Sequence, residues 1–130
     1  MALLEIEALR TVLGSGAGQV VAVDGVALSV EAGTTLSIVG ESGSGKSTLA
    51  LSIMGLIPPE RGRVEAGRLH FQGHGLFDLS ERDWSRLRGR HLAMVFQEPL
   101  TALNPVFTVG HQIDEVMGRH RGFAASAARR

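Results

Sequence analysis

The sequence contains no cysteine, and aromatic residues make up only 5% of it. Without cysteine, neither a disulfide bond nor a thiolate metal site can form. Long apolar runs are also lacking, because stretches such as VVAVDGVALSV are broken well short of the ~20 residues that a membrane helix requires. The start, MALLEIEALR, has glutamates where a signal peptide would need an unbroken apolar segment. We therefore expect no secretion signal.

Net charge is absent as well. Thirteen acidic residues balance thirteen basic residues in a chain of 130. This balance argues against general binding to nucleic acid, and the basic run RLRGR at 86–90 is more simply a solvated face. The hydrophobic fraction of 44% and the charged fraction of 20% are typical of a globular protein. We expect a single globular domain of ordinary size.

Lysine is present only once, at Lys46, although the chain has twelve arginines. Lys46 lies in GESGSGKST, which fits the phosphate-binding pattern G-x-x-x-x-G-K-[ST]. Glycines let backbone N–H groups approach an anion with no Cβ in the way, and the dipole of a following helix adds attraction. Lys46 would reach the β- and γ-phosphates of a nucleotide, and the Ser47 hydroxyl would complete a Mg²⁺ shell. Thr48 could contact the α-phosphate or cap the helix.

The elements on either side of this loop fit the motif. TLSIV, residues 35–39, is a short apolar run typical of a strand buried on both faces. Helical spacing from Leu49 to Leu56 predicts a helix that Pro58 and Pro59 end. Strand, loop and helix form the context that the motif requires. The predicted nucleotide site comprises Gly40, Glu41, Ser42, Gly43, Ser44, Gly45, Lys46, Ser47 and Thr48.

The N-terminal residues have the pattern of an antiparallel β region. Leu4, Ile6 and Ala8 alternate with glutamates, which is the period of a half-buried strand, and residues 20–30 repeat this signal. The glycine-rich segment 14–19 between them is a flexible loop by composition. We predict antiparallel strands over the first thirty residues.

The rest of the chain alternates extended and helical signals. Residues 63–72 are extended, and Ser80 caps a helix in which Asp83 lies at the third position. Trp84 occupies one position of a hydrophobic staple with Leu79 and is therefore interpreted as a packing residue. HLAMVF, residues 91–96, predicts another strand, and QEPLTALNP predicts a loop because of its two prolines.

A last amphipathic helix is predicted after Thr108, which can cap it. Val109, Ile113, Val116 and Met117 would share one of its faces. Gly122 is a plausible end of this helix. AASAARR has high helix propensity and no stop signal.

Two blocks, GESGSGKSTLALSIMGLIP and the segment GRLHFQGHGLFDLSERDWSRLRGRHLAMVFQEPLTALNPVFTVGHQI, resemble the ATP-binding subunits of ABC transporters. Within this family, the resemblance is to the group that serves oligopeptide, dipeptide and nickel importers, and it extends from about Leu4 to Gly122. QEPLTALNP resembles the Q-loop of this group. The resemblance implies that Gln97 helps to hold Mg²⁺ and the attacking water, and that the following loop contacts a membrane-spanning partner. Gln97 also follows a predicted strand, where sheets of this type present ligand-binding groups.

The implied fold is α/β: a P-loop NTPase core with an N-terminal antiparallel β region, forming an incomplete ABC-type nucleotide-binding domain. Residues 1–34 would form the β region, 35–107 the core through the Q-loop, and 108–130 the start of a helical region. The family's LSGGQ-type signature, Walker B aspartate, catalytic glutamate and switch histidine are not found in these 130 residues. The nearest imitation of Walker B, HLAMVFQE, has Gln97 in place of the aspartate. No catalytic residue is assigned, and Glu98 is not interpreted as the base.

Many ABC subunits stack an aromatic side chain on adenine, upstream of the glycine loop. The corresponding stretch here, LRTVLGSGAGQVV, has no aromatic residue. Leu9, Leu13 or Val20 would then make a weaker apolar contact with the base.

The resemblance implies an ATP-binding subunit that energises the import of peptides or similar small solutes. Its cofactors would be ATP and Mg²⁺, with Ser47 and Gln97 as metal ligands. Its partners would be membrane-spanning permease subunits and a second ATP-binding subunit, at the cytoplasmic face of the membrane and without nucleic acid. Two alternatives remain: a nucleotide-binding fragment without turnover, and another P-loop enzyme such as a small kinase. We expect weak MgATP binding and no meaningful hydrolysis by this chain alone.

Overall fold

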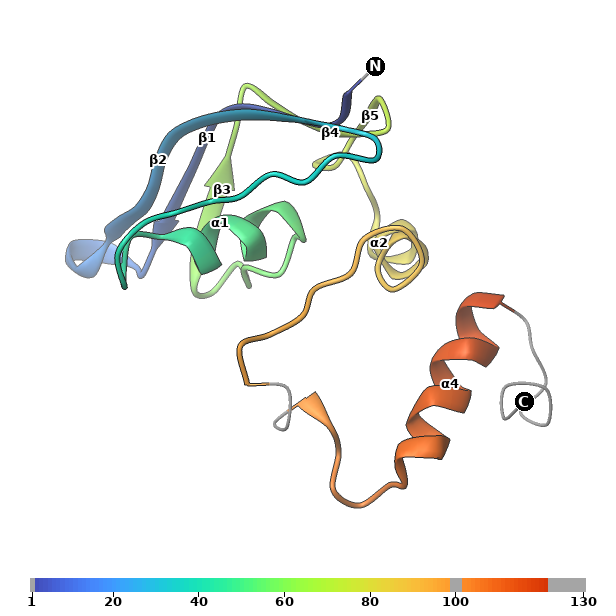
Figure 1. Cartoon of the computed structure of the whole chain (residues 1–130). Coiled ribbons are helices and arrows are strands. Elements are labelled where there is room, and N and C mark those ends of the chain that lie inside the picture. Colours follow the sequence, from blue (N-terminus) through green and yellow to red (C-terminus); the bar gives the residue numbers. More distant parts are fainter. Residues whose placement is uncertain (1, 99–101, 122–130) are drawn as a thin grey trace. The chain divides into compact units, whose positions relative to one another are not determined.

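The computed structural model describes residues 2–98 and 102–121, and the chain divides into two compact units, Met1–Leu79 and Ser80–Arg130. The first unit combines a β-sheet with one α-helix (Figure 1). Its elements are β1 (Ala2–Leu13), the 3₁₀ turn η1 (Gly16–Gly18), β2 (Val20–Glu31), α1 (Lys46–Ile53), β3 (Gly62–Glu65), β4 (Arg68–Phe71) and β5 (His74–Gly75).

The sheet is antiparallel throughout, and β1 is its central strand. β1 pairs with β2 on one side and with both β3 and β4 on the other, while β5 pairs with β4. The antiparallel β region predicted over the first thirty residues is therefore confirmed. The extended signal of residues 63–72 is also confirmed, since β3 and β4 occupy most of it.

β1 departs from the simple alternation that its sequence predicts. Between Ile6 and Leu9, which pair with Leu28 and Val26, β1 advances three residues while β2 advances two. This extra residue is a β-bulge, and Ala8 within it has a φ of 52°. Ala8 is exposed. The prediction that Ala8 shares the buried face of Ile6 is therefore wrong, because the bulge reverses the alternation.

The core of the first unit lies between the sheet and α1, which rests against β1 and β2 (Figure 1). Apolar side chains from both layers are removed from water, and this burial is the main force that holds them together. The buried apolar residues of this unit are Ile6, Leu9, Val12, Val23, Leu49, Met54, Leu69, Phe71 and Leu76.

The strand predicted over TLSIV is wrong. In the structure, residues 34–40 follow β2 with no ladder to any strand. Leu36 and Ile38 are each 48% exposed, and Val39 is 92% exposed. A strand buried on both faces needs a neighbour on each side to bond its N–H and C=O groups. No strand in the described residues takes that place, so the apolar run remains extended but unpaired.

The second unit contains the helices α2 (Glu81–Leu87) and α4 (Val109–Arg121). Both predicted caps are confirmed: Ser80 Oγ accepts from the Asp83 N–H at 3.3 Å, and Thr108 Oγ1 accepts from the His111 N–H at 3.2 Å. The predicted end of the last helix at Gly122 and the segment AASAARR lie outside the described residues.

Trp84 is buried, which agrees with its interpretation as a packing residue. The Arg88 guanidinium carbon lies 4.4 Å from the Trp84 ring centroid, within the range of a cation–π interaction. One face of the Trp84 indole is therefore covered by a side chain of the same helical segment.

The strand predicted over HLAMVF is also wrong. Only an isolated bridge between Arg88 and Leu92 forms there, and Val95 is 91% exposed. The physical reason is the same as for residues 35–39. The apolar pattern is typical of a strand buried between two neighbouring strands, and the described residues provide no such strands here.

Replacing Ser80 with alanine is expected to destabilise α2 by about 1 kcal/mol, because the hydroxyl that accepts from the Asp83 N–H and donates to the Asp83 carboxylate is lost. Hydrogen exchange of the amides of residues 81–87 should accelerate about fivefold. Arg82→Ala, at an exposed position of the same helix, is the control. Equal exchange in both variants would show that the cap contributes nothing.

Candidate functional site

Residues 40–45 form a tight turn that leads directly into α1, which begins at Lys46. The Ser44 N–H donates to the Glu41 carbonyl at 3.3 Å, and Gly43 and Gly45 have φ values of +80° and +91°. Gly45 is the N-cap of α1 in the left-handed region, and its carbonyl accepts from the Leu49 N–H at 2.8 Å. The predicted helix is confirmed, although it ends at Ile53 rather than near Leu56. Backbone N–H groups at the start of a helix favour an anion.

One glycine in this turn leaves no room for a side chain, and another lies close to a serine hydroxyl. A Cβ on Gly45 would overlap the backbone carbonyl oxygen of Ala22 in β2, and a Cβ on Gly40 would lie 2.7 Å from Ser44 Oγ. The turn is therefore packed against the sheet through bare backbone at Gly45. Only glycine combines this close approach with a positive φ.

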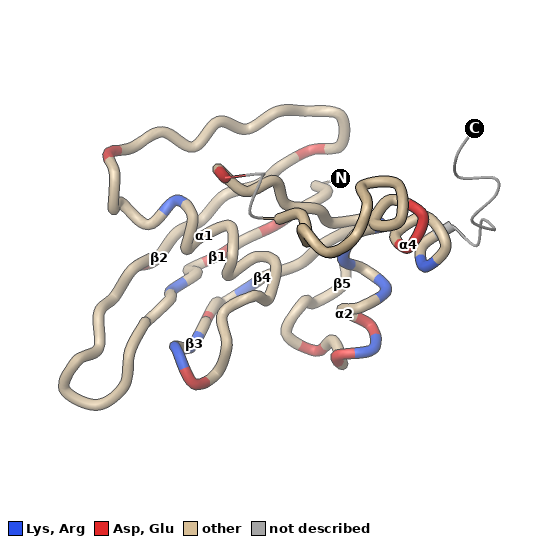
Figure 2. The backbone as a smooth tube through the Cα atoms, turned by 90° about the horizontal axis from the view of Figure 1, so that it is seen from below, with Lys and Arg blue, Asp and Glu red and all other residues tan. Residues whose placement is uncertain are grey.

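Lys46 curls back into the turn. Its Nζ donates to the carbonyl oxygens of Gly40 at 2.8 Å and Glu41 at 2.5 Å, and to Ser44 Oγ at 3.1 Å. An ammonium has three protons, so these three acceptors satisfy it. The side chain thus holds its charge inside the backbone turn. No other lysine or arginine occurs between Arg10 and Arg61, so this charge is isolated along the chain (Figure 2).

Ser47 and Thr48 follow Lys46 in the first turn of α1. Ser47 is exposed, and a hydroxyl oxygen is the kind of hard ligand that Mg²⁺ accepts. Among residues 2–98 and 102–121, no group of three His, Asp or Glu side chains could hold a metal ion. The exposed Ser47 hydroxyl would fit a Mg²⁺ ion that takes one protein ligand and otherwise phosphate oxygens and water.

The three candidates for an apolar contact with a base differ in accessibility. Leu9 is fully buried in the core between the sheet and α1, so it cannot contact a bound nucleotide. Leu13 is half-buried, and Val20 is 63% exposed. The interpretation of Leu9 as a base contact is wrong, because the bulge in β1 turns this residue inward.

Gln97 belongs to the second unit and is exposed. It does not end a strand, because the strand predicted before it does not form. Its predicted part in metal binding remains a prediction, and Glu98 has no assigned role.

The loop after Gln97 contains an arrangement that the sequence did not indicate. The Gln112 side chain accepts from the Asn104 N–H at 2.9 Å and donates to the carbonyls of Asn104 and Phe107, both at 3.1 Å. Asn104 Oδ1 accepts from the Val106 N–H at 3.0 Å. These bonds fasten residues 104–107 to the first turns of α4. An Asn-Pro pair signals a turn, but no sequence pattern indicates which distant amide would close it.

A glycine turn with the spacing G-x-x-x-x-G-K-[ST] that encloses its lysine at the start of a helix is typical of a P-loop nucleotide-binding domain. The model of the ABC transporter family matches residues 23–129, and the chain belongs to this family. The resemblance inferred from the motifs is therefore confirmed, as is the α/β fold class. Membership of this family implies nucleotide binding.

Its relatives include transport proteins of bacteria. The oligopeptide transport ATP-binding protein AppD of Bacillus subtilis (strain 168) is 42% identical over 127 residues, covering 98% of this chain and 39% of AppD. The dipeptide transport ATP-binding protein DppD of Escherichia coli (strain K12) is 46% identical over 129 residues, covering 99% and 39%. The chain thus spans less than two fifths of the length of these curated relatives.

Proposed function

We propose that this chain is the part of an ATP-binding transport subunit that holds the phosphates of MgATP. One observation carries the proposal: the Lys46 ammonium lies within the backbone turn 40–45, at the N-terminus of α1. When a phosphate enters the turn, its oxygens would replace the three internal acceptors of the Lys46 ammonium. The remaining residues of the site, Glu41, Ser42, Gly43 and Ser44, would contribute backbone N–H groups.

Mg²⁺ is proposed to bind beside the phosphates. Ser47 would supply its hydroxyl, and Gln97 would supply a carboxamide oxygen in the complete site. The metal would neutralise phosphate charge and orient the terminal phosphoryl group. No residue of the described chain is proposed as the catalytic base.

Peptides or similar small solutes are the proposed cargo, because the relatives are named for oligopeptide and dipeptide transport. The proposed partners are membrane-spanning permease subunits and a second ATP-binding subunit. The second unit exposes several large apolar side chains, as surfaces that meet another protein often do. They include Leu103, Val106, Phe107, Val109, Ile113 and Val116.

The proposed location is the cytoplasmic face of the membrane, where ATP is available. Within the described residues, no helix combines the length and apolar character needed to cross a membrane. Attachment to the membrane is proposed to come through the permease partner.

Titration of the 130-residue chain with nucleotide tests the phosphate site. We expect MgATP to bind more tightly than ATP in excess EDTA, and Ser47→Ala to abolish most of this difference, because the metal loses its protein ligand. The Kd for MgATP is expected to rise about tenfold, because the free energy lost is about that of one hydrogen bond to a charged group. Isothermal titration calorimetry provides the measurement.

Ser29→Ala is the matched control, since Ser29 is an exposed hydroxyl on β2 outside the turn. It should bind MgATP as the wild type does. If the wild-type chain gives no heat with MgATP, the proposal fails. If Ser47→Ala keeps the full Mg²⁺ effect, the metal is held elsewhere.

A further inference from the structure

Two hydroxyl groups meet inside the otherwise apolar core of the first unit. Thr11 of β1 is 0% exposed and Ser52 of α1 is 2% exposed, and their hydroxyl oxygens lie 2.7 Å apart. Ser52 Oγ also lies 2.7 Å from the carbonyl oxygen of Thr48. A buried polar pair is tolerated only when its members bond each other, and here every buried side-chain oxygen of the described residues has a partner.

The donors in this chain of bonds can be assigned. The Thr48 carbonyl has no proton, so Ser52 must donate to it. Ser52 has a single hydroxyl proton, which that bond uses. Thr11 must therefore donate to Ser52 Oγ, and the bonds run in one direction from Thr11 through Ser52 to Thr48. We call these three groups the hydroxyl relay.

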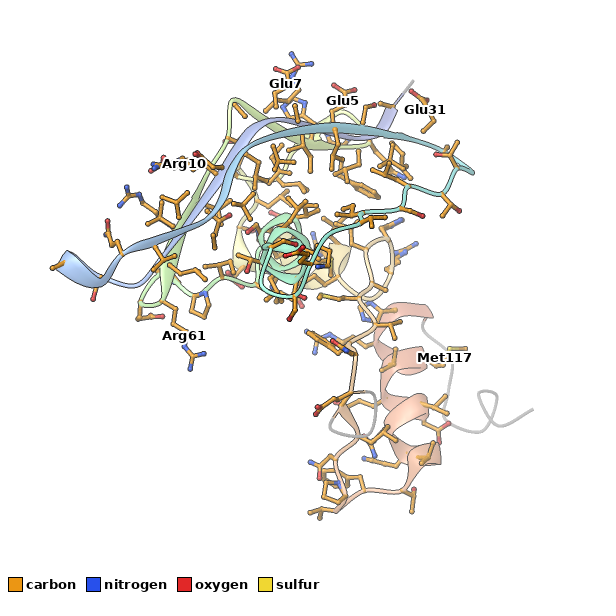
Figure 3. All side chains as sticks on the ribbon, turned by 60° about the vertical axis from the view of Figure 1, so that its left-hand side comes forward. Glu5, Glu7, Arg10, Glu31, Arg61 and Met117 are labelled. Atoms are coloured by element: carbon orange, nitrogen blue, oxygen red, sulfur yellow. The ribbon has the colours of Figure 1, made fainter. Side chains whose placement is uncertain are left out.

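The bulge in β1 is what places Thr11 inside. Before the bulge, Glu5 and Glu7 point away from α1, whereas after it Arg10 points outward (Figure 3). Ile6 is the buried residue before the bulge, and Leu9 and Thr11 are buried after it, so the inward position moves from Ile6 to residues an odd number of places along. Without the extra residue, Thr11 would face solvent and the relay could not form.

The relay ends on the first turn of α1, which carries Lys46 and Ser47. In an α-helix the Thr48 carbonyl already accepts the N–H of residue 52, so the Ser52 hydroxyl is a second donor to the same oxygen. Such side-chain bonds to the carbonyl four residues back bend helices. On the other side of the turn, Gly45 packs against the Ala22 carbonyl of β2. The beginning of α1 is thus fixed from two strands at once.

We propose that Thr11 and Ser52 are positioning residues for the phosphate site. Through the relay they set the rotation and bend of the first turn of α1, and so the direction in which Lys46 and the neighbouring N–H groups face a phosphate. The inference rests on the proposed function for its effect on affinity. Its effect on the turn itself does not depend on any nucleotide.

Two variants, Thr11→Val and Thr11→Ser, distinguish the effect of the Thr11 hydroxyl from the effect of its packing. Valine keeps the shape but removes the donor, whereas serine keeps the donor but loses a methyl group. For Thr11→Val we expect the Kd for MgATP to rise about three- to tenfold, the factor that corresponds to one net hydrogen bond. Thr11→Ser should remain within about twofold of the wild type. A role in packing alone would give the opposite order.

The double variant Thr11→Val/Ser52→Ala separates positioning from stability. Removing both hydroxyls leaves no buried group unsatisfied, so its stability should exceed that of Ser52→Ala alone, in which Thr11 keeps a donor without an acceptor. Its affinity for MgATP should nevertheless stay as low as that of Thr11→Val. This variant also keeps the test usable if a single variant fails to fold.

Backbone amide shifts of residues 43–49, measured without nucleotide, give a second readout. They should move in Thr11→Val and in the double variant, but not in Phe71→Leu, a core substitution on β4 that leaves the relay intact. Unchanged shifts in Thr11→Val would overturn the relay's role. If the wild type fails to bind MgATP while the shifts move as expected, the proposed function fails and the positioning of the turn stands. Shifts that move without a change in Kd would show that the relay does not serve the phosphate.

Discussion

Replacing Lys46 with alanine is expected to weaken MgATP binding about 30- to 150-fold. The estimate corresponds to the loss of about 2–3 kcal/mol for a charge-assisted contact to phosphate in a turn that offers no other cation. Calorimetric titration of the folded chain measures the change. Arg63→Ala is the control, because it removes a cation from an exposed pair with Glu65 on β3.

Lys46→Arg sharpens this prediction by keeping the charge. The lysine ammonium is compact and makes three bonds within the turn, to Gly40, Glu41 and Ser44. The broad planar fork of arginine cannot adopt that arrangement. We expect Lys46→Arg to bind MgATP at least about tenfold more weakly than the wild type. Full affinity in this variant would show that charge alone, rather than shape, is required.

Replacing Gly45 with alanine is expected to lower the free energy of unfolding of the first unit by about 3 kcal/mol or more. A side chain in the left-handed region costs about 1–2 kcal/mol. The new Cβ would also overlap the backbone carbonyl of Ala22, which belongs to a paired strand and cannot move alone. The helix or the strand must therefore shift.

Gly43→Ala is the matched control, because Gly43 also has a positive φ of +80° but its Cβ would meet nothing within 4 Å. Its free energy of unfolding should fall by only about 1 kcal/mol, the cost of placing a side chain in the left-handed region. Hydrogen exchange of the β1 and β2 amides reports on this unit, whereas fluorescence of Trp84 reports on the other. Equal losses in the two variants would show that the contact with Ala22 does not matter.

The phosphate turn could be predicted because its signals are local. The spacing of Gly40, Gly45 and Lys46, followed by a helical pattern, specifies a turn and a helix start within a few residues. The caps at Ser80 and Thr108 were predictable for the same reason. Each depends on a side chain and a backbone group three residues away.

Features that depend on distant partners could not be predicted. The apolar pattern of residues 35–39 and 91–96 predicted buried strands, but a strand needs neighbours to pair with, and the described residues provide none at these positions. The bulge at Ala8 leaves no clear mark in the sequence. It nevertheless decides that Leu9 is core rather than a base contact, and that Thr11 meets Ser52.

The central position of β1 has a consequence for the order of folding. β1 pairs with β2 through a short connection, but it reaches β3 and β4 only after the chain has passed through the glycine turn and α1. Closing the longer loop costs more chain entropy, so we expect the β1–β2 hairpin to form before it. The turn that holds Lys46 lies inside that longer loop. α1 and this turn nevertheless rest on β1 and β2, so the hairpin supplies their packing surface before β3 and β4 join the sheet.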